Sequence, residues 1–536
     1  MADDSYILTL DLGTTSVRAT LFSRAGAVVG RASCTYPLHH PRPGWAEQEP
    51  GLLLSAAEET IATVIRETAV LPAQIEALSL STFFHALIGM SGGGGYLTPA
   101  ITWADTRAAA DAAGLRRSSL SEELYRATGC PPHPMYPFYK FLWLRREEPE
   151  VFASSRRWSM VKDLLLWRWT GHWVLDYSVA NGTGLWNMQK QTWDEWALEL
   201  AGLERQCLPD LVPTTTILPL TEQAAARMGL LGGTPVVAGA GDGVLSSLGA
   251  GAIIPGILAA MIGTSGALRY ASDRPRTDPQ GRVWCYHLTE GTWILGGSLN
   301  NGGLVWRWFR DQLARELLTG FSEGGPGDWA GPLEGAAGRL EGAQGSDPYE
   351  RLCQEAARIP PGAEGLLFLP YLAGERSPGF NALARGVLFG LGLNHTRAHL
   401  ARATLEGIAY RLRDVLEALE DLGGRAAEVR ATGGWTRCQH WLQIAADVLD
   451  RPLVVPKEEE GSSLGAFYLA RLALGRARTL EEQIGAVSLG ARLAPRDEIS
   501  RIYDRYYQLY RRIYEKLQPD FETLATLRDG FQGHFR

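Results

Sequence analysis

The chain has 536 residues, of which 45% are hydrophobic and 21% are charged, a composition that excludes a disordered or fibrous protein. Its length corresponds to roughly three domains of ordinary size or to two large ones. The formal net charge is −7, so the chain has no general attraction to nucleic acid, and no nucleic-acid partner is expected.

The cysteines and the uncharged stretches of the chain indicate in which cellular compartment the protein lies. The six cysteines stand far apart, without CxxC or mixed Cys/His spacing, so neither a disulfide framework nor a structural zinc site is expected. Residues 243–268 carry no charge and are long enough to span a bilayer, but several glycines and Pro255 interrupt them. We therefore predict a buried strand, turn and strand there and no membrane partner. With the acidic N-terminus at Asp3 and Asp4, this favours a cytoplasmic protein.

The predicted elements begin with a hairpin. Apolar patterning predicts strands over residues 6–11 and 17–22, joined by a glycine-containing turn, and a third strand near 28–29. A helix over 51–70 and strands over 75–80 and 86–90 follow. Further along the chain we expect helices over 139–146, 162–169, 398–422 and 497–517, and a glycine-rich surface insertion over 320–347.

The second half of the chain echoes the first. The turn at 263–266 repeats the character of the turn at 13–16, and residues 428–434 repeat the strand and polar turn that begin at 75. This indicates two related α/β halves. We place the domains at 1–252 and 253–536.

The first motif that carries chemistry follows the first strand. Asp11 ends this strand, and Gly13, Thr14 and Thr15 form the turn. Glycine lets the backbone approach a ligand closely, and turn N–H groups and threonine hydroxyls can bind phosphate oxygens. Asp11 then faces a divalent metal bound to those phosphates. An ordinary turn with a capping aspartate is the alternative.

Two further glycine-containing turns resemble ligand-binding loops. Gly263 and Thr264 follow an apolar strand and can hold a polyphosphate from the side opposite the first turn. Gly433 and Gly434 stand between a strand and an apolar helix, where a nucleotide can approach the backbone and the helix dipole. Simple turns are the alternative in both cases.

A lone acid, Asp242, stands between Gly241 and Gly243 before an apolar segment. In a cleft it can accept a proton from an attacking hydroxyl, as phosphoryl transfer requires. At a helix N-terminus it can also serve only as a cap. The chain lacks GxxxxGK[ST], and it lacks GxGxxG after the first strand, which disfavours P-loop and dinucleotide-binding proteins.

In this order, the motifs resemble the FGGY carbohydrate kinase family of the actin and hexokinase superfamily. The resemblance extends from residue 6 to about residue 518. It includes GWAEQ at 44–48, TWADTR at 102–107, LPYLAGERSP at 369–378 and RGVLFGL at 385–391. It implies an α/β fold of two RNase H-like domains, with ATP and Mg²⁺ in the cleft between them.

The resemblance also implies roles for single residues. Asp242 becomes the catalytic base and Asp11 the carboxylate on the metal side. The implied phosphate contacts are Thr14, Thr15, Arg18, Gly263 and Thr264, and the implied nucleoside site is lined by Gly303, Gly433 and Gly434. Cys438 departs from the family pattern near the adenine, where a small or amide residue is more usual.

Within the family, the sequence most resembles the gluconate kinases, on segments such as 84–88, 97–107 and 133–135. A polyhydroxy acid needs hydrogen-bonding groups, an aromatic wall and a cation for its carboxylate. We assign His85 and Asp105 to hydroxyls, Trp103 to the wall, and Lys162, His133 or Arg107 to the carboxylate. The alternatives are a core histidine at 85, a surface charge at 162, and an Arg107 that only pairs with Asp105.

The sequence therefore predicts an enzyme that transfers the γ-phosphate of ATP to a terminal hydroxyl of a sugar or sugar acid, first of all D-gluconate. A kinase for xylulose or another pentulose is the alternative of the same class. An actin-like sugar sensor that has lost transfer, and a membrane transporter component, are alternatives of other classes. The sequence does not fix the oligomeric state, and a homodimer stays open.

Overall fold

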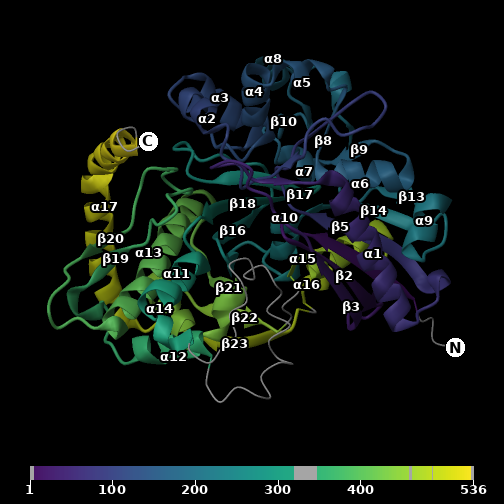
Figure 1. Cartoon of the computed structure of the whole chain (residues 1–536). Helices are drawn as coiled ribbons and strands as arrows, with labels where there is room; N and C mark the ends of the chain where they lie inside the picture. Colours follow the sequence, from purple (N-terminus) through teal and green to yellow (C-terminus); the bar gives the residue numbers. More distant parts are fainter. Residues whose placement is uncertain (1–4, 319–346, 458–460, 486, 533–536) are drawn as a thin grey trace.

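The computed structural model describes residues 5–318, 347–457, 461–485 and 487–532. Two mixed sheets flanked by helices form its centre (Figure 1). The first sheet has the strand order β13 (Ile217–Pro219), β14 (Pro235–Gly241), β5 (Ile75–Thr82), β1 (Tyr6–Leu12), β2 (Ser16–Ser23) and β3 (Val28–Thr35). The second has the order β17 (Trp284–Thr289), β18 (Thr292–Leu299), β16 (Gly266–Ser272), β15 (Ile257–Ile262), β21 (Glu428–Thr432), β22 (Leu453–Pro456) and β23 (Leu489–Leu493).

Helices cover the faces of both sheets. Those in the first half are α1 (Pro50–Thr68), α2 (Ala109–Arg116), α3 (Leu120–Thr128), α4 (Pro137–Glu147), α5 (Pro149–Ser154), α6 (Val161–Thr170), α7 (Tyr177–Asn181), α8 (Glu195–Ala201), α9 (Glu222–Met228) and α10 (Asp242–Gly249). Those in the second half are α11 (Gly303–Leu313), α12 (Pro348–Ala357), α13 (Arg397–Gly423), α14 (Gln439–Leu449), α15 (Gly461–Ala473), α16 (Glu481–Ile484) and α17 (Asp497–Gln532).

Short two-stranded ribbons complete the described structure. They pair β4 (Glu47–Gln48) with β7 (Ala100–Ile101), β6 (Ile88–Met90) with β8 (Arg157–Ser159), β9 (Val174–Asp176) with β12 (Asp210–Val212), β10 (Trp186–Asn187) with β11 (Thr192–Trp193), and β19 (Leu367–Leu369) with β20 (Val387–Phe389). The predicted insertion at 320–347 lies outside the described residues, apart from Asp347.

The first sheet is buried on both faces. Leu8, Leu10 and Leu12 alternate with Ile7 along β1, and the two sets enter different hydrophobic clusters because successive side chains of a strand point to opposite faces. β2 returns antiparallel to β1, while β5 and β14 run parallel to it. The predicted hairpin and the predicted strand over 75–80 are thus confirmed.

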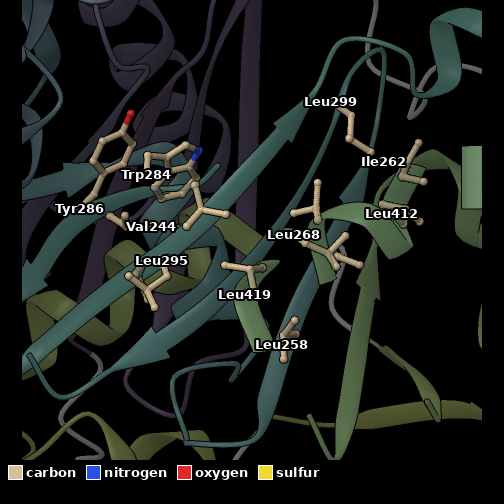
Figure 2. Packing of buried hydrophobic residues seen from close by; sticks show 14 of the residues in the cluster. Val244, Leu258, Ile262, Leu268, Trp284, Tyr286, Leu295, Leu299, Leu412 and Leu419 are labelled. Atoms are coloured by element: carbon tan, nitrogen blue, oxygen red, sulfur yellow. The ribbon is translucent and has the colours of Figure 1, made fainter. Parts of the chain in front are cut away.

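The second sheet repeats this topology. β16 returns antiparallel to β15, β21 lies parallel beside β15, and β22 lies parallel beside β21. Leucines of β15, β16 and β18 pack against Leu412 and Leu419 of α13 (Figure 2). The predicted internal echo is confirmed, and the uncharged stretch 243–268 forms α10 and a buried strand, turn and strand.

The two halves interlock between the sheets. α15, from the C-terminal half, packs on α10 and on β1 and β5 of the first sheet. The division at 252/253 stays a prediction. No described helix is both long and apolar enough to cross a bilayer. α17 continues to residue 532, beyond the predicted end at 517, and Pro519 lies within it.

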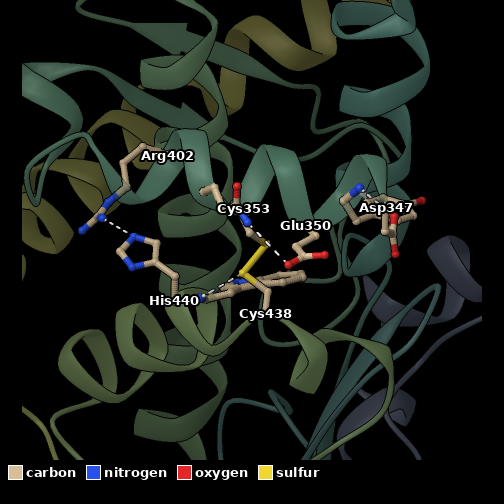
Figure 3. The surroundings of a disulfide bond; sticks show 9 residues. Asp347, Glu350, Cys353, Arg402, Cys438 and His440 are labelled. Atoms are coloured by element: carbon tan, nitrogen blue, oxygen red, sulfur yellow. Dashed lines mark hydrogen bonds between the residues drawn. A yellow bond between two sulfur atoms is a disulfide. The ribbon is translucent and has the colours of Figure 1, made fainter. Parts of the chain in front are cut away.

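The expectation for the cysteines is corrected. Cys353 on α12 and Cys438, which precedes α14, form a disulfide with a Cα–Cα distance of 6.2 Å (Figure 3). The two residues are 85 positions apart, so sequence spacing contained no sign of the pair. Packing of α12 beside α14 brings them together.

Candidate active site

A cavity of about 240 Å³ opens where the two sheets face each other. Asp242 follows β14, Thr14 belongs to the turn after β1, and Gly266 begins β16 after the turn that follows β15. Ligand sites of parallel sheets form at the carboxyl ends of strands, and this cavity has that position in both sheets. The side chains that matter below are Thr14, His85, Trp103, Asp242, Arg269 and Arg376, and all six residues line it.

Asp242 is the first residue of α10 and is partly buried. Gly241 precedes it because a Cβ there would lie 2.0 Å from the ring of Phe84. Among the described residues, the Asp242 carboxylate accepts one hydrogen bond, from the Gly243 N–H at 2.6 Å. Burial, and then the negative charge of Asp11, raise the pKa of Asp242 to about 7. The carboxylate therefore retains acceptor capacity and is poised to take a proton near neutral pH.

Asp11 lies near the end of β1, beside the cavity. Ser81 on the neighbouring strand β5 donates a hydrogen bond to the Asp11 carboxylate at 2.6 Å. The described residues hold no cluster of three or more His, Cys, Asp or Glu that could bind a metal on its own. Mg²⁺ is usually held by only one or two carboxylates together with substrate phosphates. Asp11, with Asp242 close enough to feel its charge, fits that pattern.

Hydrogen bonds from neighbouring residues stabilise the turn after β1. Its Gly13 N–H donates to the Ser16 carbonyl at 2.9 Å, and the Tyr36 hydroxyl donates to the Gly13 carbonyl at 2.5 Å. The Thr14 hydroxyl accepts a hydrogen bond from the Trp103 indole at 2.7 Å. Thr15 accepts from the Tyr36 N–H, and Arg18 lies opposite Asp11 on β2. Thr14 thus lines the cavity, while Thr15 and Arg18, which follow it along the chain, are not among the lining residues.

The turn after β15 is braced by glycines from two other segments. The Gly303 N–H donates to the Gly263 carbonyl at 2.8 Å, and the Leu304 N–H donates to the Thr264 carbonyl at 2.9 Å. A Cβ on Gly433, which has φ +94°, would lie 2.5 Å from the carbonyl oxygen of Ile262. Only glycine permits that approach. Gly434 follows directly, so the structure brings together Gly263, Thr264, Gly303, Gly433 and Gly434, and their contacts with a nucleotide stay a prediction.

His85 is buried in the cavity wall with φ +68°, and the Lys140 ammonium donates to its carbonyl at 2.5 Å. Its Nδ1 lies 2.5 Å from the Gly182 carbonyl, which can only accept, so Nδ1 carries the proton. Burial, with the charges of Lys140 and Arg376, lowers the pKa of His85 to about 3. Nε2, 3.5 Å from the Tyr286 hydroxyl, is therefore an acceptor suited to a substrate hydroxyl.

Aromatic side chains form much of the remaining wall. Trp103, Trp284 and Tyr286 line the cavity, and the Trp284 and Tyr286 rings stack at 4.2 Å (Figure 2). The predicted wall residue Trp103 is in place. An aromatic wall beside hydrogen-bonding groups suits a polyhydroxylated ligand.

Asp105 does not line the cavity. Its carboxylate is buried and accepts hydrogen bonds from the Arg107 guanidinium, from the Arg107 N–H and from the Ala46 N–H. Arg107 also pairs with Glu47 and lies 3.7 Å from the Trp45 ring centroid. The assignments of Asp105 and Arg107 to substrate are corrected, because each is saturated by protein groups.

The assignment of Lys162 to the substrate carboxylate is corrected as well. Its ammonium is fully buried and donates to the carbonyls of Leu80, Ala238 and Ala240 at 2.9 to 3.2 Å, with Asp176 at 3.5 Å. It therefore ties β5 to β14 beneath the cavity, and it is not a surface charge either. His133 does not line the cavity, although its neighbour Met135 does, and the His133 ring accepts a hydrogen bond from the Met135 N–H at 3.2 Å. Burial, and then the charge of Arg376, hold the pKa of His133 well below its usual value.

Two cationic residues that line the cavity were not predicted from the sequence. They are Arg269 on β16 and Arg376 after β19. Arg376 lies within the segment 369–378 that carried the family resemblance, but no role was attached to it. Arg269 lies two residues after Ala267 on the same strand, and both line the cavity. Strand alternation from the turn at 263–266 was the available sign.

The FGGY model for the N-terminal domain of carbohydrate kinases matches residues 6–249, and that for the C-terminal domain matches residues 258–474. The chain belongs to the FGGY family of carbohydrate kinases. Its two-domain, actin- and hexokinase-like α/β fold and its class as a phosphotransferase follow from that membership, and the predictions of both are confirmed.

Similar proteins within the FGGY family indicate which substrates its members of this kind use. A gluconokinase of Bacillus subtilis (strain 168) is 37% identical over 532 residues, 99% of each chain. Two crystal structures from Lactobacillus acidophilus, described as a gluconate kinase and as a ligand-bound xylulose kinase, are each 32% identical. Both align with a TM-score of 0.88 over 97% of this chain and 100% of theirs. The chain is thus similar to FGGY kinases of both substrate types.

Proposed function

We propose that this FGGY kinase transfers the γ-phosphate of ATP to the terminal hydroxyl of D-gluconate. The observation that carries the proposal is Asp242, a carboxyl group with spare acceptor capacity in a cavity that also holds two guanidinium groups. The gluconokinase similarity at 37% identity supports the same substrate.

The reaction requires a base and a site that stabilises the transferring group. The substrate hydroxyl oxygen attacks the γ-phosphorus and forms the new P–O bond. The bond between the γ-phosphorus and the β–γ bridging oxygen breaks, and ADP leaves. Asp242 accepts the proton that the hydroxyl loses and later releases it to solvent. His85 Nε2 accepts a hydrogen bond from another substrate hydroxyl and orients the chain of carbons.

The nucleotide has a natural place against the two turns. In the proposal, Thr14, Thr15, Arg18, Gly263 and Thr264 contact the phosphates, and the glycines 303, 433 and 434 line the nucleoside site. When bound, Mg²⁺ would be held by Asp11 with phosphate oxygens and would neutralise their charge. Use of ATP makes the cytoplasm the expected compartment.

Xylulose is the second candidate substrate, because the xylulose kinase structure aligns as well as the gluconate kinase structure. The test is ADP release by the purified protein with D-gluconate and with D-xylulose at matched concentrations. The proposal predicts a higher kcat/KM with D-gluconate. Preference for D-xylulose contradicts the sugar-acid assignment, and binding of ATP and sugar without turnover favours a sensor.

A further inference from the structure

The buried arginines of the described structure fall into two groups. Four of them form ion pairs with carboxylates: Arg402 with Glu406 at 2.6 Å, Arg411 with Glu375 at 2.7 Å, Arg430 with Glu428 at 3.3 Å and Arg451 with Glu420 at 2.7 Å. The other two, Arg269 and Arg376, are equally buried, with 6% and 8% of their surface exposed. Neither has a carboxylate oxygen within 4.0 Å in the described part of the chain, and both line the cavity.

The Arg376 guanidinium has an N–H donor without an acceptor. Its Nη2 donates to the Leu299 carbonyl at 3.0 Å, while its Nε is buried without an acceptor. Burial, and to a smaller extent the charge of Arg269, lower its pKa to about 10. Its guanidinium carbon lies 5.6 Å from the ring centroid of Trp103, the predicted wall residue. The group therefore lacks a counter-charge and has only part of the hydrogen bonding that a buried guanidinium needs.

Arg269 is in the same condition. Its Nη1 donates to the Ser246 hydroxyl at 3.1 Å, and its Nε also has no acceptor. The charge of Asp242 acts on it, but the two groups form no ion pair, so the base is not tied up. Two buried cations that repel each other across one cavity are stabilised by an anion that lies between them.

We infer that Arg269 and Arg376 together bind the carboxylate of an open-chain sugar acid and so select acids over neutral sugars at this site. The inference rests on the proposed function and adds to it the groups that read the acid. Guanidinium forks match a carboxylate with two parallel hydrogen bonds, and the idle Nε–H groups supply donors for them.

The phosphate of ATP is the other anion that could fill this place. Arg269 is the guanidinium whose charge acts on Asp242 at the reacting end, whereas the charge of Arg376 acts on His85 and His133, and Arg376 lies beside Trp103. A carboxylate at the far end of a six-carbon chain fits that position, while a transferring phosphoryl group must lie beside Asp242.

The test measures kcat/KM for D-gluconate and for D-glucitol, which carries CH₂OH in place of the carboxylate, in the wild type, Arg269→Gln and Arg376→Gln. We expect each substitution to lower kcat/KM for gluconate by about 10- to 100-fold, as for a lost charged hydrogen bond, and to change that for glucitol less than about threefold. Arg269→Lys and Arg376→Lys, which keep the charge, should recover part of the loss. Gluconate binding by calorimetry without nucleotide gives a second readout and separates binding from turnover.

Equal losses for gluconate and glucitol, or a raised KM for ATP with an unchanged dissociation constant for gluconate, would overturn the inference and assign the arginines to the phosphates. Unchanged gluconate kinetics in both variants would overturn it as well. A wild type that phosphorylates xylulose and not gluconate but binds gluconate through these arginines would refute only the proposed function.

Discussion

Asp105 and Asp242 are both acidic residues beside an arginine, yet the structure uses them in opposite ways. Asp105 accepts hydrogen bonds from Arg107 and from two backbone N–H groups, which leaves it no function beyond holding the chain. Asp242 accepts one N–H, faces a cavity and stays apart from Arg269. A buried polar group points to chemistry when the protein leaves it unsatisfied, and residue type alone does not distinguish the two cases.

The largest effect is expected at the unsatisfied carboxylate. Asp242→Asn removes the base while keeping the shape of the side chain, so kcat should fall by at least about 10²-fold. The measurement is ADP release at saturating sugar acid and ATP, with nucleotide affinity measured by calorimetry to show that ATP still binds. Turnover near that of the wild type would remove Asp242 from the mechanism.

The matched variant at the saturated carboxylate is Asp105→Asn. It leaves the buried Arg107 without its main counter-charge, so we expect a clear drop in the urea midpoint of unfolding. Turnover of the protein that remains folded should change only a few-fold. If this variant instead folds normally and loses turnover as Asp242→Asn does, the contrast between the two carboxylates fails.

Lys162 provides a second saturated group. Lys162→Met leaves Asp176 as a buried, uncompensated charge and should destabilise the fold by about 3–5 kcal/mol. The double variant Lys162→Met with Asp176→Asn removes that charge and keeps an N-cap for α7, so it should recover most of the stability. Urea unfolding compares the three proteins. A normal unfolding midpoint with a raised KM for gluconate in Lys162→Met would restore Lys162 as a substrate contact.

The raised pKa of Asp242 predicts a pH dependence. The base must be ionised, so kcat should fall about tenfold for each unit of pH below the value of about 7. A pH–rate profile between pH 5 and 9 measures this. A profile that is flat through pH 6 and breaks near pH 4 would show that burial does not control this carboxyl.

Stability supplies the control for that profile. A folded-state pKa above the unfolded value of about 3.9 means that the native state holds the proton more tightly, so stability is lost as pH rises from about 4 to 7. Asp242→Asn has no such proton. Its melting temperature relative to that of the wild type should therefore rise over this pH range.

A further effect is expected at Gly433, on nucleotide binding. Gly433→Ala forces a Cβ against the Ile262 carbonyl at a positive φ, a strain of about 1–3 kcal/mol, and should raise KM for ATP about tenfold or more. Gly424→Ala is the matched control, because Gly424 has φ +83° and open space around its Cβ position. The same KM for ATP in both variants would separate this glycine from nucleotide binding.

Much of the fold was predictable because its information is local. The turns at 13–16 and 263–266, each after an apolar strand, revealed the duplicated hairpins, and the same turns supplied the candidate phosphate contacts. Asp242 was found for a similar reason, since a lone acid between glycines at the end of an apolar strand is a local pattern.

The features that the sequence did not predict correctly depend on tertiary packing. Lys162 looks like any lysine until β5 and β14 present three carbonyls to it, and Cys353 meets Cys438 only because α12 packs beside α14. Arg269 and Arg376 belong to the same class, because an arginine on a strand or in a loop carries no local sign that its counter-charge is missing.

The position of the new phosphate on the product tests the central claim most directly. If Asp242 is the base and the arginine pair binds the carboxylate, ¹³C and ³¹P NMR of the product formed from D-gluconate and ATP should show a phosphomonoester on the carbon farthest from the carboxylate. Phosphate on a carbon next to the carboxylate, or no phosphorylation of gluconate at all, would contradict this arrangement of the site.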